Sequence, residues 1–275
     1  GDPIHALKLL QDKGYSLHLA DLSQSETFEE ALDEMLADLY QEVSRLSPEP
    51  KVTDLMALAY DYYHLKLLLK NRFQGIPTER LCLGLGTIPV AKMSRDLASG
   101  DLRDFPGLMR ETIERVQEKL EQTQDPLWID LLLDRACCRQ MSATADFFAS
   151  ELISQVILRR IDLVNLVSWM RCQRLKKGRE WLKEYWLEGG CLDLELFQRL
   201  FQESLDTLVS RLSHTDYGTL IRKCLEETTT ERQMLCLEKE GQSLVLDDLN
   251  AARRIPFGPE PLLAYLLARE AEIRN

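Results

Sequence analysis

The sequence lacks any long hydrophobic run. None of its 275 residues belongs to a stretch approaching the about 18 consecutive apolar residues that cross a membrane as a helix. The longest uncharged segment, residues 81–91, contains Gly84, Gly86 and Pro89, so it cannot be one continuous helix. No signal peptide is recognisable. The chain begins at Gly1 without an initiator Met, and we expect the natural N-terminus to lie beyond it.

Basic residues are in the minority. Lys and Arg number 34 against 45 Asp and Glu, giving a net charge of −11. An acidic surface repels phosphate backbones, which argues against nucleic acid as a partner. Anionic lipid is a poor partner for the surface as a whole, although a local basic patch can still touch it. A hydrophobic fraction of 45% favours a soluble, well-packed protein over a disordered one.

Reactive constellations are also missing from the sequence. None of the four histidines stands in a metal-binding spacing, and there is no phosphate-binding loop and no Gly-x-Ser-x-Gly elbow. Gly84-Leu85-Gly86 lacks the third glycine of a dinucleotide site. We therefore predict no catalytic residue, no metal ion and no cofactor, and a binding protein in preference to an enzyme. An enzyme with a buried site that spacing does not reveal is the remaining alternative.

The cysteines follow no metal-binding or redox motif. They are odd in number, no Cys-x-x-Cys occurs, and most fall inside apolar helical patterns. We predict reduced, buried thiols in a cytosolic protein. Adjacent cysteines can form a strained disulfide, but two small core residues are the preferred interpretation of the one such pair. The seven residues are Cys82, Cys137, Cys138, Cys172, Cys191, Cys224 and Cys236.

Helical periodicity runs through almost the whole chain. Apolar residues recur at steps of three and four between Phe28 and Leu46 and again between Thr53 and Phe73. The second of these helices is apolar on most sides, so we expect it to be buried between neighbours. Because no alternating strand pattern occurs, the sequence predicts an all-α protein. Further helices are predicted at 107–124, 127–140, 142–177, 192–212, 219–228, 230–238, 244–254 and 261–275, with a bend or new cap near 161–162.

A short pattern recurs along these helices. An acid is followed three residues later by His or Asn in three places: Asp61 and His64, Asp162 and Asn165, and Glu272 and Asn275. Helices share such patterns by chance, and that is one interpretation. The other is a true repeat of three similar helical units, at residues 1–80, 81–178 and 179–275. We predict a structural role for these pairs, because polar groups buried on a helix need hydrogen-bond partners.

One basic cluster stands out in this acidic chain. It comprises Arg171, Arg174, Lys176, Lys177 and Arg179, with Lys183 nearby. One interpretation is a solvated helix end whose cations complement the helix dipole before Gly178. The other is a contact for an acidic protein partner or for membrane head groups.

Five segments together resemble the C-subunit family of V/A-type ATP synthases (V-type ATPases), whose eukaryotic members are called d subunits. Residues 60–70 resemble its Tyr-Asp-x-x-Asn-Leu-Lys-x-Leu-Leu-Lys segment, with His64 at the usual Asn. Residues 85–88 resemble its Leu-Gly-Thr-Ile loop and residues 161–165 its Ile-Asp-Leu-x-Asn segment. Residues 188–193 resemble its Pro-Gly-Gly-x-Leu-Asp turn with Glu188 in place of Pro, and residues 261–275 its closing block. The segments follow one another in the family's order.

The resemblance implies a fold and a function. The fold would be three similar helical units arranged as a funnel with pseudo-threefold symmetry. The function would be that of a non-catalytic component linking the D and F subunits of the central stalk to the membrane proteolipid ring. It would transmit torque during ATP-driven ion transport or ATP synthesis, and it would sit peripherally on the cytoplasmic side of the membrane. The family's N-terminal helix is absent here, and its closing block is cut at Asn275.

A second interpretation needs no rotary complex. An unrelated helical-repeat scaffold that binds a protein partner would show the same periodicity and the same lack of reactive groups. It would form an extended superhelix with a concave face, in contrast to a closed funnel.

Overall fold

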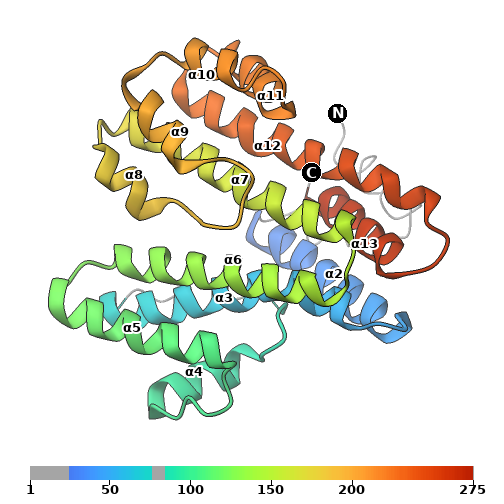
Figure 1. Ribbon diagram of the computed structural model, residues 1–275. Helices are drawn as coiled ribbons and strands as arrows, with labels where there is room; N and C mark the ends of the chain where they lie inside the picture. The colour runs from blue at the N-terminus through green and yellow to red at the C-terminus, as the bar shows by residue number, and fades with distance from the viewer. Residues whose placement is uncertain (1–24, 76–83, 275) are drawn as a thin grey trace. The chain divides into compact units, whose positions relative to one another are not determined.

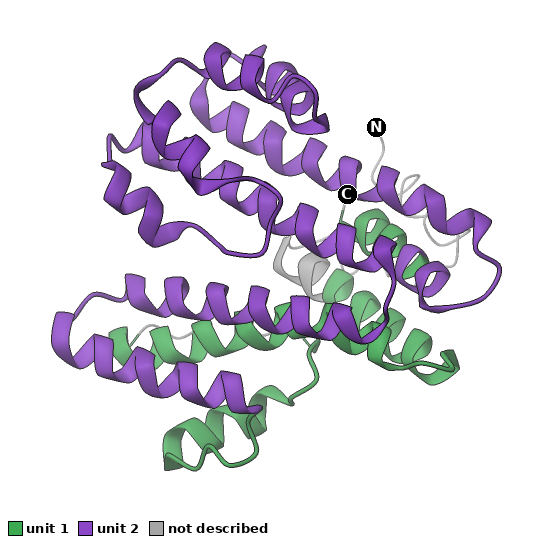
Figure 2. Ribbon diagram, viewed as in Figure 1, with its two compact units in different colours: residues 1–105, 265–275 green, residues 106–264 purple. Residues whose placement is uncertain are grey.

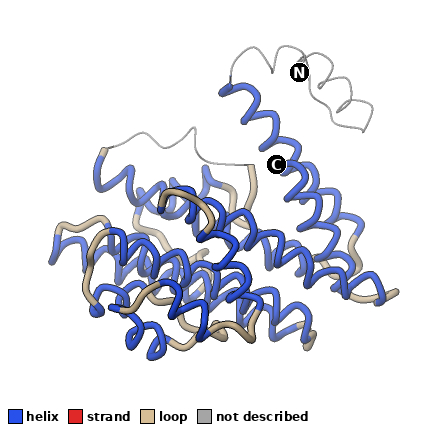
Figure 3. The backbone as a smooth tube through the Cα atoms, turned by 90° about the horizontal axis from the view of Figure 1, so that it is seen from above, coloured by secondary structure: helices blue, strands red, loops and turns tan. Residues whose placement is uncertain are grey.

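The computed structural model describes residues 25–75 and 84–274, and within these ranges every regular element is a helix (Figures 1 and 3). The prediction of an all-α protein is confirmed. No helix in the described ranges has the length and apolar content needed to cross a membrane. The elements are α2 (Ser25–Leu46), α3 (Lys51–Gln74), α4 (Val90–Ser99), α5 (Gly107–Thr123), α6 (Leu127–Phe147), α7 (Glu151–Arg174), α8 (Arg179–Tyr185), α9 (Leu194–Arg199), η2 (Leu200–Gln202), α10 (Leu205–Arg211), α11 (Asp216–Leu225), α12 (Thr230–Leu249), η3 (Asn250–Arg254) and α13 (Pro259–Arg274).

Proline sets where many of these helices begin. Pro50, Pro89, Pro106 and Pro126 directly precede α3, α4, α5 and α6, and α13 starts at Pro259 itself. Proline suits a helix start because its fixed φ is helical and its missing N–H would have no partner there. The sequence thus sets these boundaries locally.

The chain folds into two compact units (Figure 2). The first comprises residues 1–105 and 265–275, and the second comprises residues 106–264. This division follows contacts within the fold. The three units of the sequence repeat are a different partition, and that partition stays a prediction.

The core of the first unit is built around α3. Leu55, Met56, Tyr62 and Leu65 are almost fully buried, and buried residues occur on most sides of this helix. The prediction of a helix buried between neighbours is therefore confirmed. Two polar side chains of α3, Asp61 and His64, share this interior.

The core of the second unit joins α7 to α12 and to the short helices between them. Trp169 and Phe197 are fully buried, and their rings meet edge to face at 6.0 Å. Leu208 of α10 and Leu237 of α12 complete the same cluster. Large buried side chains at these positions hold α7, α9, α10 and α12 together.

Several predicted helix boundaries are wrong. The separate helices predicted at 230–238 and 244–254 are instead one helix, α12, followed by η3. Helix α6 runs past Gln140 to Phe147, and α7 begins only at Glu151, because Ala149 adopts a left-handed φ of 48° and Ser150 caps α7. Helix α7 then continues through 161–162 without a new cap. The single helix predicted at 192–212 is instead α9, η2 and α10, since the Ser204 hydroxyl caps a new helix by accepting from Thr207 N.

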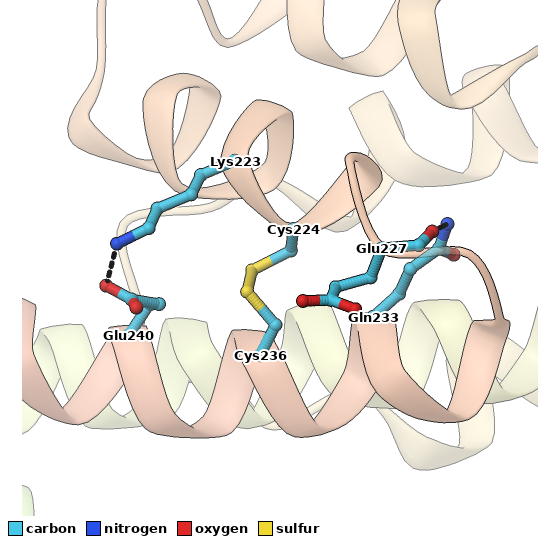
Figure 4. Close-up of a disulfide and its surroundings, with 6 residues drawn as sticks. All are labelled: Lys223, Cys224, Glu227, Gln233, Cys236 and Glu240. Atoms are coloured by element: carbon cyan, nitrogen blue, oxygen red, sulfur yellow. Dashed lines mark hydrogen bonds and ion pairs between the residues drawn. A yellow bond between two sulfur atoms is a disulfide. The ribbon is translucent and has the colours of Figure 1, made fainter.

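The prediction that every cysteine is reduced is wrong for two of them. Cys224 of α11 and Cys236 of α12 form a disulfide (Figure 4), with their Cα atoms 5.4 Å apart. These two helices pack side by side, so residues twelve apart in the sequence meet across the turn between them. Cys137, Cys138, Cys172 and Cys191 form no disulfide with any described residue, whereas Cys82 lies outside the described residues.

Candidate functional site

Asp61 of α3 holds the chain segment that leads into α4. Its Oδ1 atom accepts hydrogen bonds from the backbone N–H groups of Thr87 at 2.9 Å and Ile88 at 3.0 Å. Its Oδ2 accepts from the Thr87 hydroxyl at 2.6 Å. Burial raises the pKa of Asp61 above its usual range, and these three hydrogen bonds act in the opposite direction. One fully buried carboxylate thereby fixes a loop about 26 residues further along the chain.

Gly86 makes this close approach possible. A Cβ atom at this position would lie 2.5 Å from the Asp61 Oδ1 atom, and the backbone has a φ of 112°, which other residues rarely adopt. The glycine of the Leu-Gly-Thr-Ile segment is thus explained by contact with the carboxylate.

Asp162 of α7 makes a corresponding set of contacts in the second unit. Its two oxygens accept from the backbone N–H groups of Cys191 at 3.0 Å and Leu192 at 2.9 Å, and the Tyr217 hydroxyl donates at 2.7 Å. Burial and the adjacent Asp162 carboxylate raise the pKa of Tyr217 well above its usual range. A Cβ atom at Gly190 would collide with the Asp162 carboxylate. The glycine turn predicted at residues 189–190 therefore lies directly against Asp162.

The residues three positions later also lie in the interior. Asn165 donates from Nδ2 to the Leu187 carbonyl at 2.9 Å and accepts the Leu187 N–H at 2.8 Å, so one amide satisfies both backbone groups of Leu187. His64 occupies the matching position in α3 and is fully buried, which lowers its pKa to about 4. Its imidazole is therefore neutral at physiological pH.

The third pair of the sequence pattern has a different environment. The Glu272 side chain is 46% exposed and forms an ion pair with Arg269. Asn275 lies outside the described residues. The carboxylate buried in α13 is that of Glu270, two positions earlier. Asp61 and Asp162 each hold a later backbone segment through two N–H groups. We propose that this shared contact is the structural basis of the repeat in the first two of the three predicted repeat units.

Glu270 connects α13 to the first unit's other helices. It accepts from the Tyr60 hydroxyl at 2.5 Å and from the Tyr40 hydroxyl at 3.2 Å, and Arg274 donates to the same Tyr60 hydroxyl at 2.6 Å. The tyrosine rings meet edge to face at 5.8 Å. This network joins residues more than 200 positions apart, and no local pattern in the sequence indicated it.

The sequence did not predict a second buried ionic group, which is centred on Arg159. Arg159 of α7 is almost fully buried and pairs with Asp216 of α11 and with Asp248 of α12. Burial disfavours its charge, yet the hydrogen bonds that the guanidinium donates to Asp248 and Asp216 outweigh that effect and raise the pKa of Arg159. Asp247 and Asp248 look like a solvated acidic pair in the sequence, and only the packing of α7 against α12 shows that Asp248 faces a cation.

The basic cluster divides into two parts. Arg171 pairs with Glu238 at 3.5 Å and Arg174 with Glu231 at 2.5 Å, so these two arginines fasten the end of α7 to α12. Their side chains are about half exposed, which limits such pairs to a modest contribution of about 0–1 kcal/mol each. Lys176, Lys177 and Arg179 are exposed and form no ion pair with any residue in the described ranges.

The three cations lie on a turn that directly follows α7 and has a well-defined backbone conformation. Lys176 adopts a left-handed φ of 50°, and the Lys177 N–H donates to the Cys172 carbonyl at 3.0 Å, which closes the end of α7. Cations here complement the partial negative charge of the last carbonyls. Both interpretations of the cluster therefore remain compatible with its geometry. We call residues 176–179 the basic turn.

The described residues line clefts in both units. One of about 360 Å³ lies between α2, α3 and residues 84–86. Another, of about 350 Å³, lies between α5, α6 and the segment from Lys183 to Leu194, where Arg135 donates to the Glu184 carbonyl at 2.5 Å. In the described part of the chain, no three His, Cys, Asp or Glu side chains are grouped as metal ligands. Asp61, Asp162 and Asn165 bind backbone groups of the chain itself, whereas Glu270 and Arg159 bind side chains of other helices.

The sequence of this chain is similar to those of known proteins along its length. Residues 5–275 match a family model described as ATP synthase (C/AC39) subunit. The C subunit of the A-type ATP synthase of Methanocaldococcus jannaschii is 26% identical over 289 residues, covering 97% of this chain and 72% of that protein. The C subunit of the V-type sodium ATPase of Enterococcus hirae is 22% identical over 275 residues, covering 100% and 83%. The C subunit of the A-type ATP synthase of Desulfurococcus is 25% identical over 282 residues, covering 97% and 74%.

Proposed function

Because the chain belongs to the ATP synthase (C/AC39) subunit family, we propose that it is the non-catalytic coupling component of a rotary ATPase. In this role it links the D and F subunits of the central stalk to the membrane proteolipid ring. It passes torque between them during ATP-driven ion transport or ATP synthesis. The family match across residues 5–275 is the observation that carries this proposal.

Torque transmission needs a stiff protein, and the described contacts support that requirement. Helices packed at the density of a protein interior resist shear. The loops between them would be the weak points, yet Asp61 and Asp162 each fix a following loop through two backbone N–H groups. Asn165 fixes Leu187 through both its N–H and its carbonyl group. A load applied to these loops is therefore carried into α3 and α7.

The proposed arrangement follows the family resemblance. Three helical units surround a central opening, and the tip of the stalk enters that opening. The rim of the contact is polar, because this protein must stay soluble before it assembles. The role calls for a shaped surface that holds under load, and it needs no catalytic group. The protein sits peripherally, on the cytoplasmic side of the membrane, as part of the complex.

Binding to purified partners tests this proposal. The full chain is titrated against a purified complex of the D and F subunits from the same source. We expect saturable binding, with a contact near the standard buried area of about 1,600 Å² for a specific interface. An unrelated acidic helical protein of similar net charge serves as the control. If the full chain binds neither the D–F complex nor membranes that carry the proteolipid ring, the coupling role is rejected.

A further inference from the structure

The loop between η3 and α13 exposes an aromatic side chain to an unusual degree. Phe257 is 88% exposed, the largest fraction for any large apolar side chain in the described ranges. Single exposed apolar residues are common on protein surfaces and need no explanation by themselves. The backbone and the charges around Phe257 distinguish it from those. In Figure 1 the loop is the red turn that leads into α13.

The backbone of this loop is fixed by its own sequence. Pro256 and Pro259 enclose Phe257 and Gly258, and each proline locks its φ near −65°. Gly258 has a φ of 128°, which only glycine adopts readily. A Cβ atom at Gly258 would lie 2.6 Å from the Glu260 Oε2 atom, so that side chain packs against the turn. Phe257 is therefore presented on a preorganised turn.

Failure to reach a core does not account for this exposure. Leu249 and Ala252 before the loop and Leu263 after it are buried, so both ends of the loop are anchored. The conformation between those anchors turns the aromatic ring outward. An aromatic side chain on a rigid support loses little conformational freedom when it binds, which is the property of an interface anchor.

Two cationic residues, Arg253 and Arg254, shortly precede Phe257 in the sequence. Arg253 and Arg254, at the end of η3, are exposed, and their side chains form no ion pair or hydrogen bond with the described residues. The whole chain carries a net charge of −11, so this is a local reversal of sign. Aromatic and arginine side chains are the types enriched at the energetic centres of protein interfaces. A complementary surface would offer an apolar pocket with carboxylates at its rim.

We propose that residues 253–258, the Phe257 loop, dock onto a neighbouring protein subunit of the rotary ATPase. Phe257 enters an apolar pocket of that neighbour, and the two arginines pair with acidic side chains at its rim. The inference rests on the proposed function, which supplies the neighbouring subunits. A lipid surface is the less favoured occupant, because stable membrane attachment generally requires a second anchoring signal and the overall charge repels anionic lipid.

Site-specific photo-crosslinking in the assembled complex tests this docking. A photoreactive phenylalanine analogue replaces Phe257, and in a matched control it replaces Phe147, another exposed phenylalanine of the same unit. We expect the probe at 257 to form a crosslink to one protein subunit, and a different pattern from position 147. The probe variant must still co-purify with the complex. If it then crosslinks only to lipid, or to nothing, the docking proposal is overturned and the coupling role stays intact. Absence of the unsubstituted chain from the complex would instead reject the coupling role.

Affinity measurements supply an independent readout. Phe257→Ala should weaken reassociation with ATPase complexes stripped of this protein by at least about tenfold, because truncation of an interface anchor has effects of that size. Phe147→Ala should leave the affinity unchanged. Arg253→Glu with Arg254→Glu should slow association and reduce its salt dependence. Protein-free vesicles of the same lipids should not bind the Phe257 loop. Equal affinity of all variants would contradict the proposal.

Discussion

At the scale of single residues, Asp61 shows how one buried carboxylate organises a distant segment. It accepts two backbone N–H groups and one hydroxyl, all from residues 87 and 88. Removing the acceptor leaves those donors unpaired in the interior, whereas removing only its charge does not. The two kinds of substitution therefore separate hydrogen bonding from electrostatics.

Asp61→Ala should lower the free energy of unfolding by about 3 kcal/mol, because two buried N–H groups lose their partner. Asp61→Asn should cost only about 1 kcal/mol, since the amide oxygen can still accept from both N–H groups and the raised pKa shows that burial disfavours the charge. Urea unfolding followed by circular dichroism measures both variants. Equal losses for Ala and Asn would contradict the assigned role of the backbone donors.

His64 should make the protein sensitive to mild acid. Burial lowers its pKa to about 4 in the fold, against a usual value of 6.5. Between these values the unfolded chain binds a proton that the native protein does not, so stability is complete above pH 6.5 and falls as the pH drops towards 4. The loss attributable to this one group is about 3 kcal/mol.

His64→Asn should remove that share of the pH dependence, because an amide does not titrate. Unfolding free energies at about pH 7 and about pH 4.5, on either side of most of this transition, are compared for the wild type and the variant. The same replacement at an exposed histidine, His214→Asn, is the matched control. Identical pH dependence in the wild type and His64→Asn would show that the buried imidazole is not the responsible group.

At the scale of elements, the pair α11 and α12 is held by more than packing. The Cys224–Cys236 disulfide crosses between the two helices, Lys223 pairs with Glu240 at 2.6 Å, and Gln233 donates to the Glu227 carbonyl at 3.0 Å (Figure 4). Helix α12 also forms ion pairs with Arg171 and Arg174 of α7. The disulfide therefore supports the helix against which the end of α7 rests.

Cys236→Ser should lower the free energy of unfolding by about 3 kcal/mol relative to the oxidised protein, the value expected for a closed loop of this length. A reductant should destabilise the wild type by a similar amount and leave the variant unchanged. Thermal unfolding with and without dithiothreitol measures both effects. Cys191→Ser, which removes an exposed free thiol, is the control. A wild type that is insensitive to reductant would contradict a stabilising disulfide.

At the scale of the whole molecule, the basic turn presents positive charge that has no ion-pair partner among the described residues of this acidic protein. Replacing Arg174 would also break its ion pair with Glu231, so a clean test leaves it in place. Lys176, Lys177 and Arg179 are the residues to change.

Triple replacement of Lys176, Lys177 and Arg179 by Glu should weaken association with the D–F complex or the proteolipid ring. It should also flatten the salt dependence of that association, because exposed charges act through screened, long-range attraction. The same reversal at Arg211, Arg222 and Lys239, which are also exposed, is the matched control. Circular dichroism should show an intact fold in both. Unchanged affinity and salt response would assign the basic turn to the role of a solvated helix end.

The sequence by itself determined the class of fold and much of its local detail. Apolar residues at helical spacing predicted an all-α protein and a buried α3, because periodicity reports which side of an element faces the interior. The spacing of Asp61 from His64 and of Asp162 from Asn165 predicted buried polar groups with structural partners. The family resemblance, carried by short segments in order, indicated the rotary ATPase before any contact was known.

Only the tertiary structure decided which groups those residues meet. The segments that Asp61 and Asp162 hold, the carboxylate that Tyr40 and Tyr60 share, and the partners of Arg159 and Cys224 all come from other elements. Burial is encoded locally by periodicity, whereas a hydrogen-bond or disulfide partner depends on how separate helices pack. The break within 192–212 has a local cause, because the Ser204 hydroxyl caps α10 by accepting the Thr207 N–H. Only the packing around Phe197 comes from other elements.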